Sequence, residues 1–129
     1  MASMLPDWRS DVEQIEVSAR TLDDFAAHLG KPVDVLKIDT EGTEALVLGG
    51  GMQTLTKDQP FVVCEVLAAG HTADDLTDLM KGAGYSIYLL DERGPRHTNR
   101  VLGNEAEGCR NYLFIPARRL PRARELLDI

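Results

Sequence analysis

The sequence predicts a layered α/β domain with a mostly parallel sheet and a C-terminal pair of antiparallel strands. Apolar runs typical of buried strands lie at 33–39, 61–67, 85–90 and 111–115. Segments with helical spacing separate the first three runs, which favours parallel strands joined by helices. No long helical pattern separates the last two, so we expect those strands to pair antiparallel. A chain of 129 residues suits one domain of this class.

The first twenty residues differ from the rest. We assign residues 1–20 to an N-terminal arm with one short strand, and residues 21–129 to a single α/β domain. Residues 1–10 have no apolar period and are typical of an arm. Polar and apolar residues alternate over Gln14–Arg20, a pattern that predicts a half-buried strand.

Helix signals lie between the strands. Thr21 is the expected N-cap of a helix over 22–29, which Gly30 ends. Further helices are expected at 43–48, 52–56, 73–81 and 120–127. Residues 91–108 are polar and predict an extended loop with one short strand near Val101.

Composition narrows the class of function. The 21 acidic and 14 basic residues give a net charge of −7, which argues against a general nucleic-acid binder. The apolar runs are far shorter than a membrane span, and no signal peptide is visible, so we expect a cytoplasmic protein. Cys64 and Cys109 are the only cysteines, which excludes a disulfide framework and a cysteine-based zinc site.

Charge is divided unevenly along the chain. Residues 1–92 hold 17 acids and 6 bases, a net charge of −11, whereas residues 93–129 hold 8 arginines and 4 acids, a net charge of +4. We interpret the basic tail as a solvated helical face. The alternative is contact with an anionic substrate, a lipid head group or the acidic body of a neighbouring subunit.

The strongest candidate site lies in the segment Leu36–Glu44. Asp39 and Glu41 follow a strand that is apolar on both faces, as expected for a strand covered on both sides, and they precede a helix. Ligands of open α/β sheets bind at this end of the strands. The two carboxylates could ligate a divalent metal or accept a proton from a hydroxyl. In the structural alternative, Glu41 and Glu44 stabilise the helix dipole and Asp39 ends the strand.

Other candidates have weaker signals. Glu65 and Lys37 lie inside apolar strands, where a charged side chain needs a partner. They either line the site or form ion pairs, Glu65 with Lys37 or an arginine and Lys37 with a neighbouring carboxylate. His71 follows the strand at 61–67 and is the histidine nearest the expected site. Cys64 has the character of a small buried apolar residue without an activating neighbour.

Several of these motifs together resemble one family, the FkbM-type methyltransferases. The matching segments are Thr21–Phe25, Val33–Glu44, Leu48–Gly50 and Pro60–Val66, followed in order by Gly84–Tyr85 and Asn111–Phe114. They look like the C-terminal half of the family's domain, over about residues 15–116, and the string Leu-Lys-Ile-Asp-Thr-Glu-Gly-Thr-Glu is quite specific.

This resemblance implies a Rossmann-like methyltransferase half and S-adenosylmethionine-dependent O-methylation of a sugar or secondary-metabolite hydroxyl. It implies that Asp39 and Glu41 line the acceptor site as catalytic residues, with a divalent metal as a further expectation. Glu65, His71 and Lys37 are then the residues expected to bind the small-molecule acceptor.

The sequence departs from the family in its cofactor loop. These enzymes carry a Gly-rich loop after their first strand and an acidic residue after their second, and both should precede Thr21. Gly49–Gly51 does not replace that loop, because it lies in or after a helix rather than after a strand. We therefore expect an incomplete cofactor site and an inactive isolated chain. The alternative is a noncatalytic remnant that acts as an interaction or assembly module.

The strand at 33–39 also bears on assembly. In the full family fold it lies next to the first strand and is central, so here we expect one unpaired edge. Gln14–Arg20 would cover that edge poorly, and open edges promote association. We therefore expect a homodimer through this edge or the adjacent helix faces, supported by the opposite charges of the body and the tail.

Overall fold

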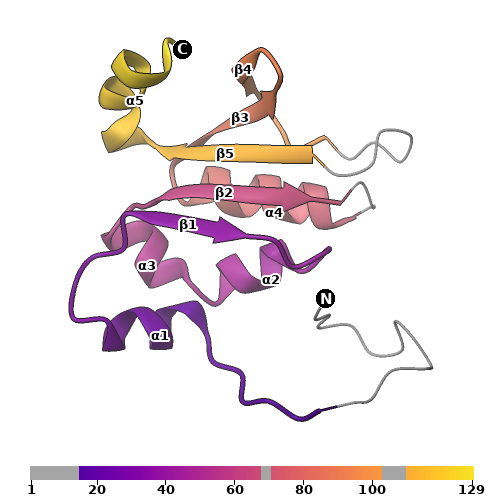
Figure 1. Cartoon of the computed structure of the whole chain (residues 1–129), viewed down its shortest axis with the longest axis vertical. Coiled ribbons are helices and arrows are strands. Elements are labelled where there is room, and N and C mark those ends of the chain that lie inside the picture. Colours follow the sequence, from indigo (N-terminus) through magenta and orange to yellow (C-terminus); the bar gives the residue numbers. More distant parts are fainter. Residues whose placement is uncertain (1–14, 68–70, 103–109) are drawn as a thin grey trace.

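The computed structural model describes residues 15–67, 71–102 and 110–129 of the chain (Figure 1). The arm expected over residues 1–10 lies outside these residues. The helices are α1 (Leu22–His28), α2 (Glu44–Gly49), α3 (Met52–Lys57), α4 (His71–Gly82) and α5 (Leu120–Leu127), with a 3-10 turn at Ala117–Arg119. The strands are β1 (Val35–Ile38), β2 (Phe61–Val66), β3 (Tyr85–Asp91), β4 (Gly94–Thr98) and β5 (Arg110–Pro116).

The five strands form one mixed sheet in the order β1-β2-β5-β3-β4. Within the described residues, only β1 and β2 pair in parallel, while β5 pairs antiparallel with both β2 and β3, and β4 pairs antiparallel with β3. The prediction of a mostly parallel sheet is therefore wrong. The reason is that β5, the last strand in sequence, lies between β2 and β3 with reversed direction. The antiparallel pairing expected for the last two predicted strands is confirmed.

The segment after β3 forms a hairpin, not the extended loop that was expected. β4 pairs with β3 from Ile87 opposite Thr98 to Asp91 opposite Gly94. Gly94 has a φ of 97°, a left-handed conformation that glycine adopts without steric cost. Val101, where a short strand was expected, is buried but lies outside any strand, and its N–H donates to Thr77 Oγ1 at 2.9 Å.

The strand predicted over 14–20 is also wrong for the described residues. Residues 15–20 have no regular secondary structure, and residue 14 lies outside the description. Ile15 and Val17 are 78% and 74% exposed. An alternating pattern forms a strand only where a neighbouring strand accepts its backbone hydrogen bonds, and none of the described strands pairs with this segment.

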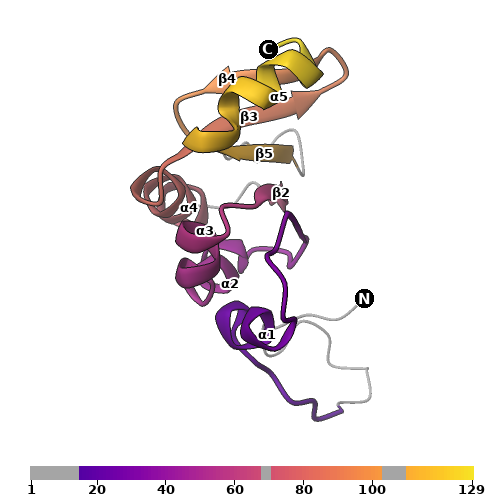
Figure 2. The ribbon, with the colours of Figure 1, turned by 90° about the vertical axis from the view of Figure 1, so that its left-hand side faces the viewer.

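Helices cover the two faces of the sheet unequally (Figure 2). α2, α3 and α4 lie along one face and bury the larger apolar core, whose fully buried members include Leu48, Leu55, Val62, Cys64, Leu76, Met80 and Phe114. α5 packs against the other face through a smaller cluster that contains Tyr88, Leu113, Ile115 and Ala123.

Among the described strands, β1 lies at one edge of the sheet, and it is only partly covered. Its burial alternates, with Ile38 buried and Val35 61% exposed. The expectation that this strand is covered on both sides is therefore wrong. The smaller cluster under α5 extends to Phe61 and Val63 of β2 but includes no residue of β1.

Candidate functional site

The turn after β1, residues 39–43, carries the two predicted catalytic carboxylates; we call it the site turn. Asp39 is exposed and Glu41 is half-buried. Glu41 has a φ of 55° and Gly42 a φ of 106°, so two successive residues are left-handed. That conformation costs a non-glycine residue about 1–2 kcal/mol. Other contacts must therefore hold Glu41 in place.

Glu44, the first residue of α2, supplies those contacts. Its side chain is 0% exposed. Its Oε1 accepts hydrogen bonds from the Thr40 N–H at 3.2 Å, the Thr40 hydroxyl at 3.1 Å and the Gly42 N–H at 3.1 Å. Its Oε2 is buried and has no hydrogen-bond partner among the described residues. From the sequence, Glu44 was expected only to stabilise the helix dipole. The available signal for its role in the turn was the nearness of donors at Thr40 and Gly42, within four residues.

Lys37 stands beside Asp39. The two side chains are about half exposed, and Lys37 Nζ lies 3.8 Å from Asp39 Oδ2. The predicted burial of Lys37 is wrong, because β1 is at the edge of the sheet. Among the described residues, the carboxylate that pairs with Lys37 is the neighbouring Asp39 rather than Glu65. An exposed pair of this kind adds little stability, so both groups stay available to a ligand.

Glu65 lies on the same face of the sheet as Lys37. Ile38 is opposite Cys64 in the parallel register, so the alternation of side chains places Lys37 and Glu65 on the other face. Glu65 is half-buried, and it forms no ion pair with any residue in the described ranges. On β5, Asn111 is directly opposite Glu65 and is exposed.

This register brings Lys37, Glu65 and Asn111 together on one face near the carboxyl ends of β1 and β2, beside the site turn. Asn111 was not predicted as a site residue, because its position depends on β5 pairing with β2. His71 begins α4, five residues after β2 ends, and its side chain lies outside the description.

A metal site finds no support in the described part of the chain. No three His, Cys, Asp or Glu side chains lie close enough there to hold a metal ion. Cys64 is buried, and desolvation together with the nearby charge of Glu44 raises the pKa of its thiol to about 12. Cys64 is therefore no nucleophile at neutral pH. No helix in the described ranges has the length and apolar character needed to cross a bilayer.

The described residues do not form a nucleotide loop either. Gly49–Gly51 joins α2 to α3, whereas a nucleotide loop follows a strand and opens a helix. A Cβ built at Gly51 would lie 2.4 Å from Leu22 Cδ2, so the space beside this glycine is filled by α1. These residues do not fit S-adenosylmethionine.

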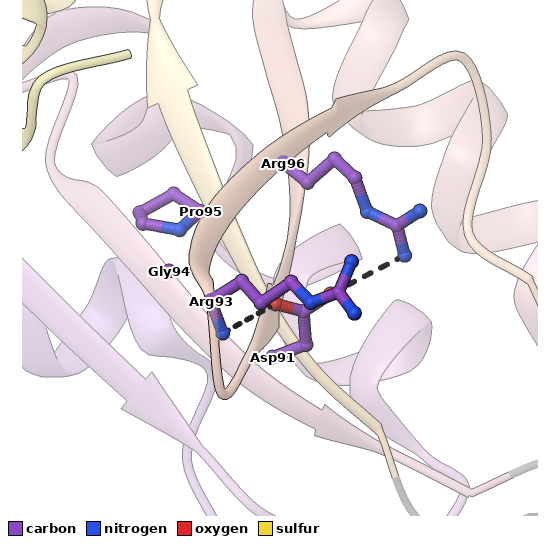
Figure 3. Close-up of a pocket in the computed structure, with 5 residues that line it drawn as sticks. All are labelled: Asp91, Arg93, Gly94, Pro95 and Arg96. Atoms are coloured by element: carbon purple, nitrogen blue, oxygen red, sulfur yellow. Dashed lines mark hydrogen bonds and ion pairs between the residues drawn. The ribbon is translucent and has the colours of Figure 1, made fainter.

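A hollow lies at the tip of the β3–β4 hairpin, away from the site turn (Figure 3). Asp91 is one of the residues that line it: its Oδ1 accepts the Arg93 N–H at 2.8 Å, and its Oδ2 lies 3.3 Å from Arg96 Nη2. None of the predicted site residues lines it. The Asp91 contacts close the hairpin, and we assign this hollow no catalytic role.

The comparisons agree with the motif at the site turn. The family model described as the methyltransferase FkbM domain matches residues 2–87 of the 129-residue chain. The matched region runs from before α1 into β3 and contains every predicted site residue. No curated protein and no solved structure matches the chain significantly.

Proposed function

Because the chain belongs to the FkbM methyltransferase family, we propose that it forms the acceptor side of a site for methyl transfer from S-adenosylmethionine to a small-molecule hydroxyl. The observation that carries this proposal is the site turn, in which Asp39 and Glu41 follow a strand end while Glu44 holds the backbone beneath them.

The residues of the chain divide into two roles. Asp39 or Glu41 accepts the proton of the acceptor hydroxyl, which raises the nucleophilicity of its oxygen. Lys37, Glu65 and Asn111 bind further hydroxyls of a polyhydroxylated acceptor such as a sugar, because an ammonium donates, a carboxylate accepts and an amide does both. His71 joins this group as a proposed acceptor-binding residue.

We further propose that residues 21–129 correspond to one half of a Rossmann-like domain. The supporting observation is that β1, β2 and β3 run in one direction, with the reversed β5 between β2 and β3. In this proposal the Gly-rich cofactor loop comes from outside these 129 residues, and the chain alone is inactive. A partner carrying the loop would add its strand at the open edge of β1.

Calorimetric titration of the chain with S-adenosylmethionine tests whether the cofactor loop lies outside these residues. We expect a dissociation constant weaker than about 1 mM, since the described residues offer no backbone loop to hold the cofactor. Micromolar binding would overturn the proposal that the cofactor loop lies elsewhere.

Activity is tested in a fusion of this chain behind the Gly-rich half of an active FkbM methyltransferase. Transfer of a labelled methyl group to a panel of sugars is the measurement. Asp39→Asn and Glu41→Gln should abolish transfer while the circular dichroism and melting temperature stay unchanged. Full turnover in both variants, or an equal loss of thermal stability, would return these two residues to the structural alternative.

The exposed edge of β1 favours a second candidate function, a noncatalytic assembly module that forms a homodimer. Val35 on this edge is 61% exposed, and Phe25 of α1 and Leu46 of α2 are 56% and 73% exposed. Exposed apolar side chains and a strand edge without a described partner are each typical of interfaces. One edge accepts one strand, so a homodimer through β1 and a cofactor-binding half at β1 exclude each other.

A further inference from the structure

The buried carboxylate of Glu44 is unusual in where its hydrogen bonds go. All three described bonds end on Thr40 and Gly42 of the site turn, and none reaches another strand or helix. A carboxylate without solvent contact is costly unless it is hydrogen-bonded. A core residue that served packing alone would not need this charge. The hydrogen bonds of Glu44 therefore stabilise the conformation of the site turn.

The turn needs such contacts because of its backbone. Glu41 is left-handed between two residues whose N–H groups point to the same oxygen. If that acceptor were removed, the N–H groups of Thr40 and Gly42 would lose their shared partner, and Glu41 could return to a negative φ. Both changes would redirect the carboxylates of Asp39 and Glu41.

We propose that Glu44 is the positioning residue of the site: its Oε1 fixes the site turn so that Asp39 and Glu41 face the acceptor. This inference rests on the proposed function for its link to methyl transfer, but its structural part is independent of activity. The role needs an acceptor atom and not a charge. A glutamine amide can keep oxygen at the Oε1 position and place its NH2 where Oε2 has no described partner.

Three variants of the full chain separate this role from simple packing. Glu44→Leu keeps a side chain of similar size but removes the acceptor oxygen. Glu44→Gln keeps the acceptor. Leu48→Ala is the matched control. Leu48 is also 0% exposed on α2, so its truncation should lower the stability of the protein, but Leu48 makes no described hydrogen bond to the turn. Amide hydrogen exchange by NMR reports each backbone position, and urea unfolding gives the global stability of each variant.

In Glu44→Leu, we expect the Thr40 and Gly42 amides to exchange about tenfold faster than the loss of global stability explains, since each loses a bond to a charged acceptor. Glu44→Gln should restore exchange at both amides to the wild-type rate. Leu48→Ala should speed exchange only in proportion to its lost stability. Unchanged turn amides in Glu44→Leu, or an equal effect in Leu48→Ala, would overturn the proposal.

The same variants in the fusion described above connect the turn to activity. Glu44→Leu should lose methyl transfer at a temperature where it is folded, while Glu44→Gln and Leu48→Ala retain it. Retained transfer in Glu44→Leu would overturn the positioning role. If the unmodified fusion transfers no methyl group, the proposed function fails, and the exchange rates of Thr40 and Gly42 still decide whether Glu44 fixes the turn.

Discussion

Leu22 in α1 occupies the space that any side chain at Gly51 would need. A Cβ at Gly51 would lie 2.4 Å from Leu22 Cδ2 and 3.0 Å from Leu22 Cβ. The contact joins α1 to the start of α3, and α1 has no fully buried residue of its own. Asp23, the next residue, accepts hydrogen bonds from the Gln53 N–H at 3.0 Å and the Thr54 N–H at 2.8 Å. The docking of α1 thus depends on this close approach and on the Asp23 carboxylate.

Gly51→Ala should therefore destabilise the protein by about 1–3 kcal/mol, the usual cost of forcing extra atoms into a filled site. The added methyl meets the base of the Leu22 side chain and not only its flexible end, so α1 must move. Urea unfolding measures the loss. Gly49→Ala is the control: its Cβ meets only Leu79 Cδ1 at 3.8 Å, and it should change stability by less than about 1 kcal/mol. Equal effects at both glycines would contradict the close contact.

The free energy of unfolding should decrease at acidic pH because of Asp23. Burial alone would raise the pKa of this carboxyl, but the bonds from the Thr54 and Gln53 N–H groups and the Thr54 hydroxyl outweigh it, so the pKa falls below the ordinary 3.8. A lowered folded pKa means that the stabilisation is complete above the unfolded pKa and is lost as pH falls through the folded one.

Asp23→Asn should accordingly cost up to about 1 kcal/mol at pH 7, because the amide keeps an acceptor oxygen but loses the negative charge that strengthens these bonds at the start of α3. The two proteins should converge at strongly acidic pH. Urea unfolding across this pH range is the measurement. Asp24→Asn is the matched control, because its side chain is 51% exposed and its partner is an exposed Arg20 at 3.8 Å. Parallel pH curves for wild type and Asp23→Asn would refute the assignment.

Replacing Glu41 with glycine should abolish function without lowering the stability of the protein. Glu41→Gly removes the carboxylate and also the left-handed strain at φ 55°, so we expect stability that is unchanged or higher by up to about 1 kcal/mol. Methyl transfer by the fusion should be lost. Glu41→Gln, which keeps the strain and loses the charge, should match wild-type stability and also lose transfer. A clear destabilisation by glycine would mean that Glu41 has a structural partner.

The strands and helices that pack the core were predictable because each has its own periodic signal. The four apolar runs became β1, β2, β3 and β5, and Thr21 caps α1 through a hydrogen bond from the Asp24 N–H to Thr21 Oγ1 at 3.1 Å. β4 was missed because its sequence, Gly-Pro-Arg-His-Thr, has no apolar alternation and forms at the sheet edge by pairing with β3. The local sequence pattern predicts a helix or strand, but it does not predict which other elements pair with it.

The site residues were also predictable only where the signal is local in the sequence. Asp39 and Glu41 were identifiable because they follow a strand and precede a helix. The placement of Asn111 opposite Glu65 depends on the β2–β5 pair, and residues 46 positions apart in sequence give no local sign of it. Glu44 is similar: a charged residue at a helix start is ordinarily exposed, and only the packed structure shows it at 0% exposure.

The open edge of β1 leads to a test of assembly in which the position of the substitution matters. The Phe61 N–H donates to the Asp34 carbonyl at 2.9 Å. In a parallel ladder the Leu36 N–H then points back to β2, and the Val35 N–H points to the open edge. Val35→Pro should thus remove an edge donor and keep the fold, since edge strands tolerate proline.

If copies of the chain associate through this edge, light scattering should show a dimer for the wild type at high micromolar concentration and a monomer for Val35→Pro. Leu36→Pro is the control for damage to the sheet: it removes a bond to β2 and should lower the unfolding free energy by about 1–3 kcal/mol, whereas Val35→Pro should change it by less than about 1 kcal/mol. A monomeric wild type would exclude the homodimer and leave the edge open to a cofactor-binding half. A dimer that persists in folded Val35→Pro would move the interface away from β1, toward the exposed side chains of Phe25 and Leu46.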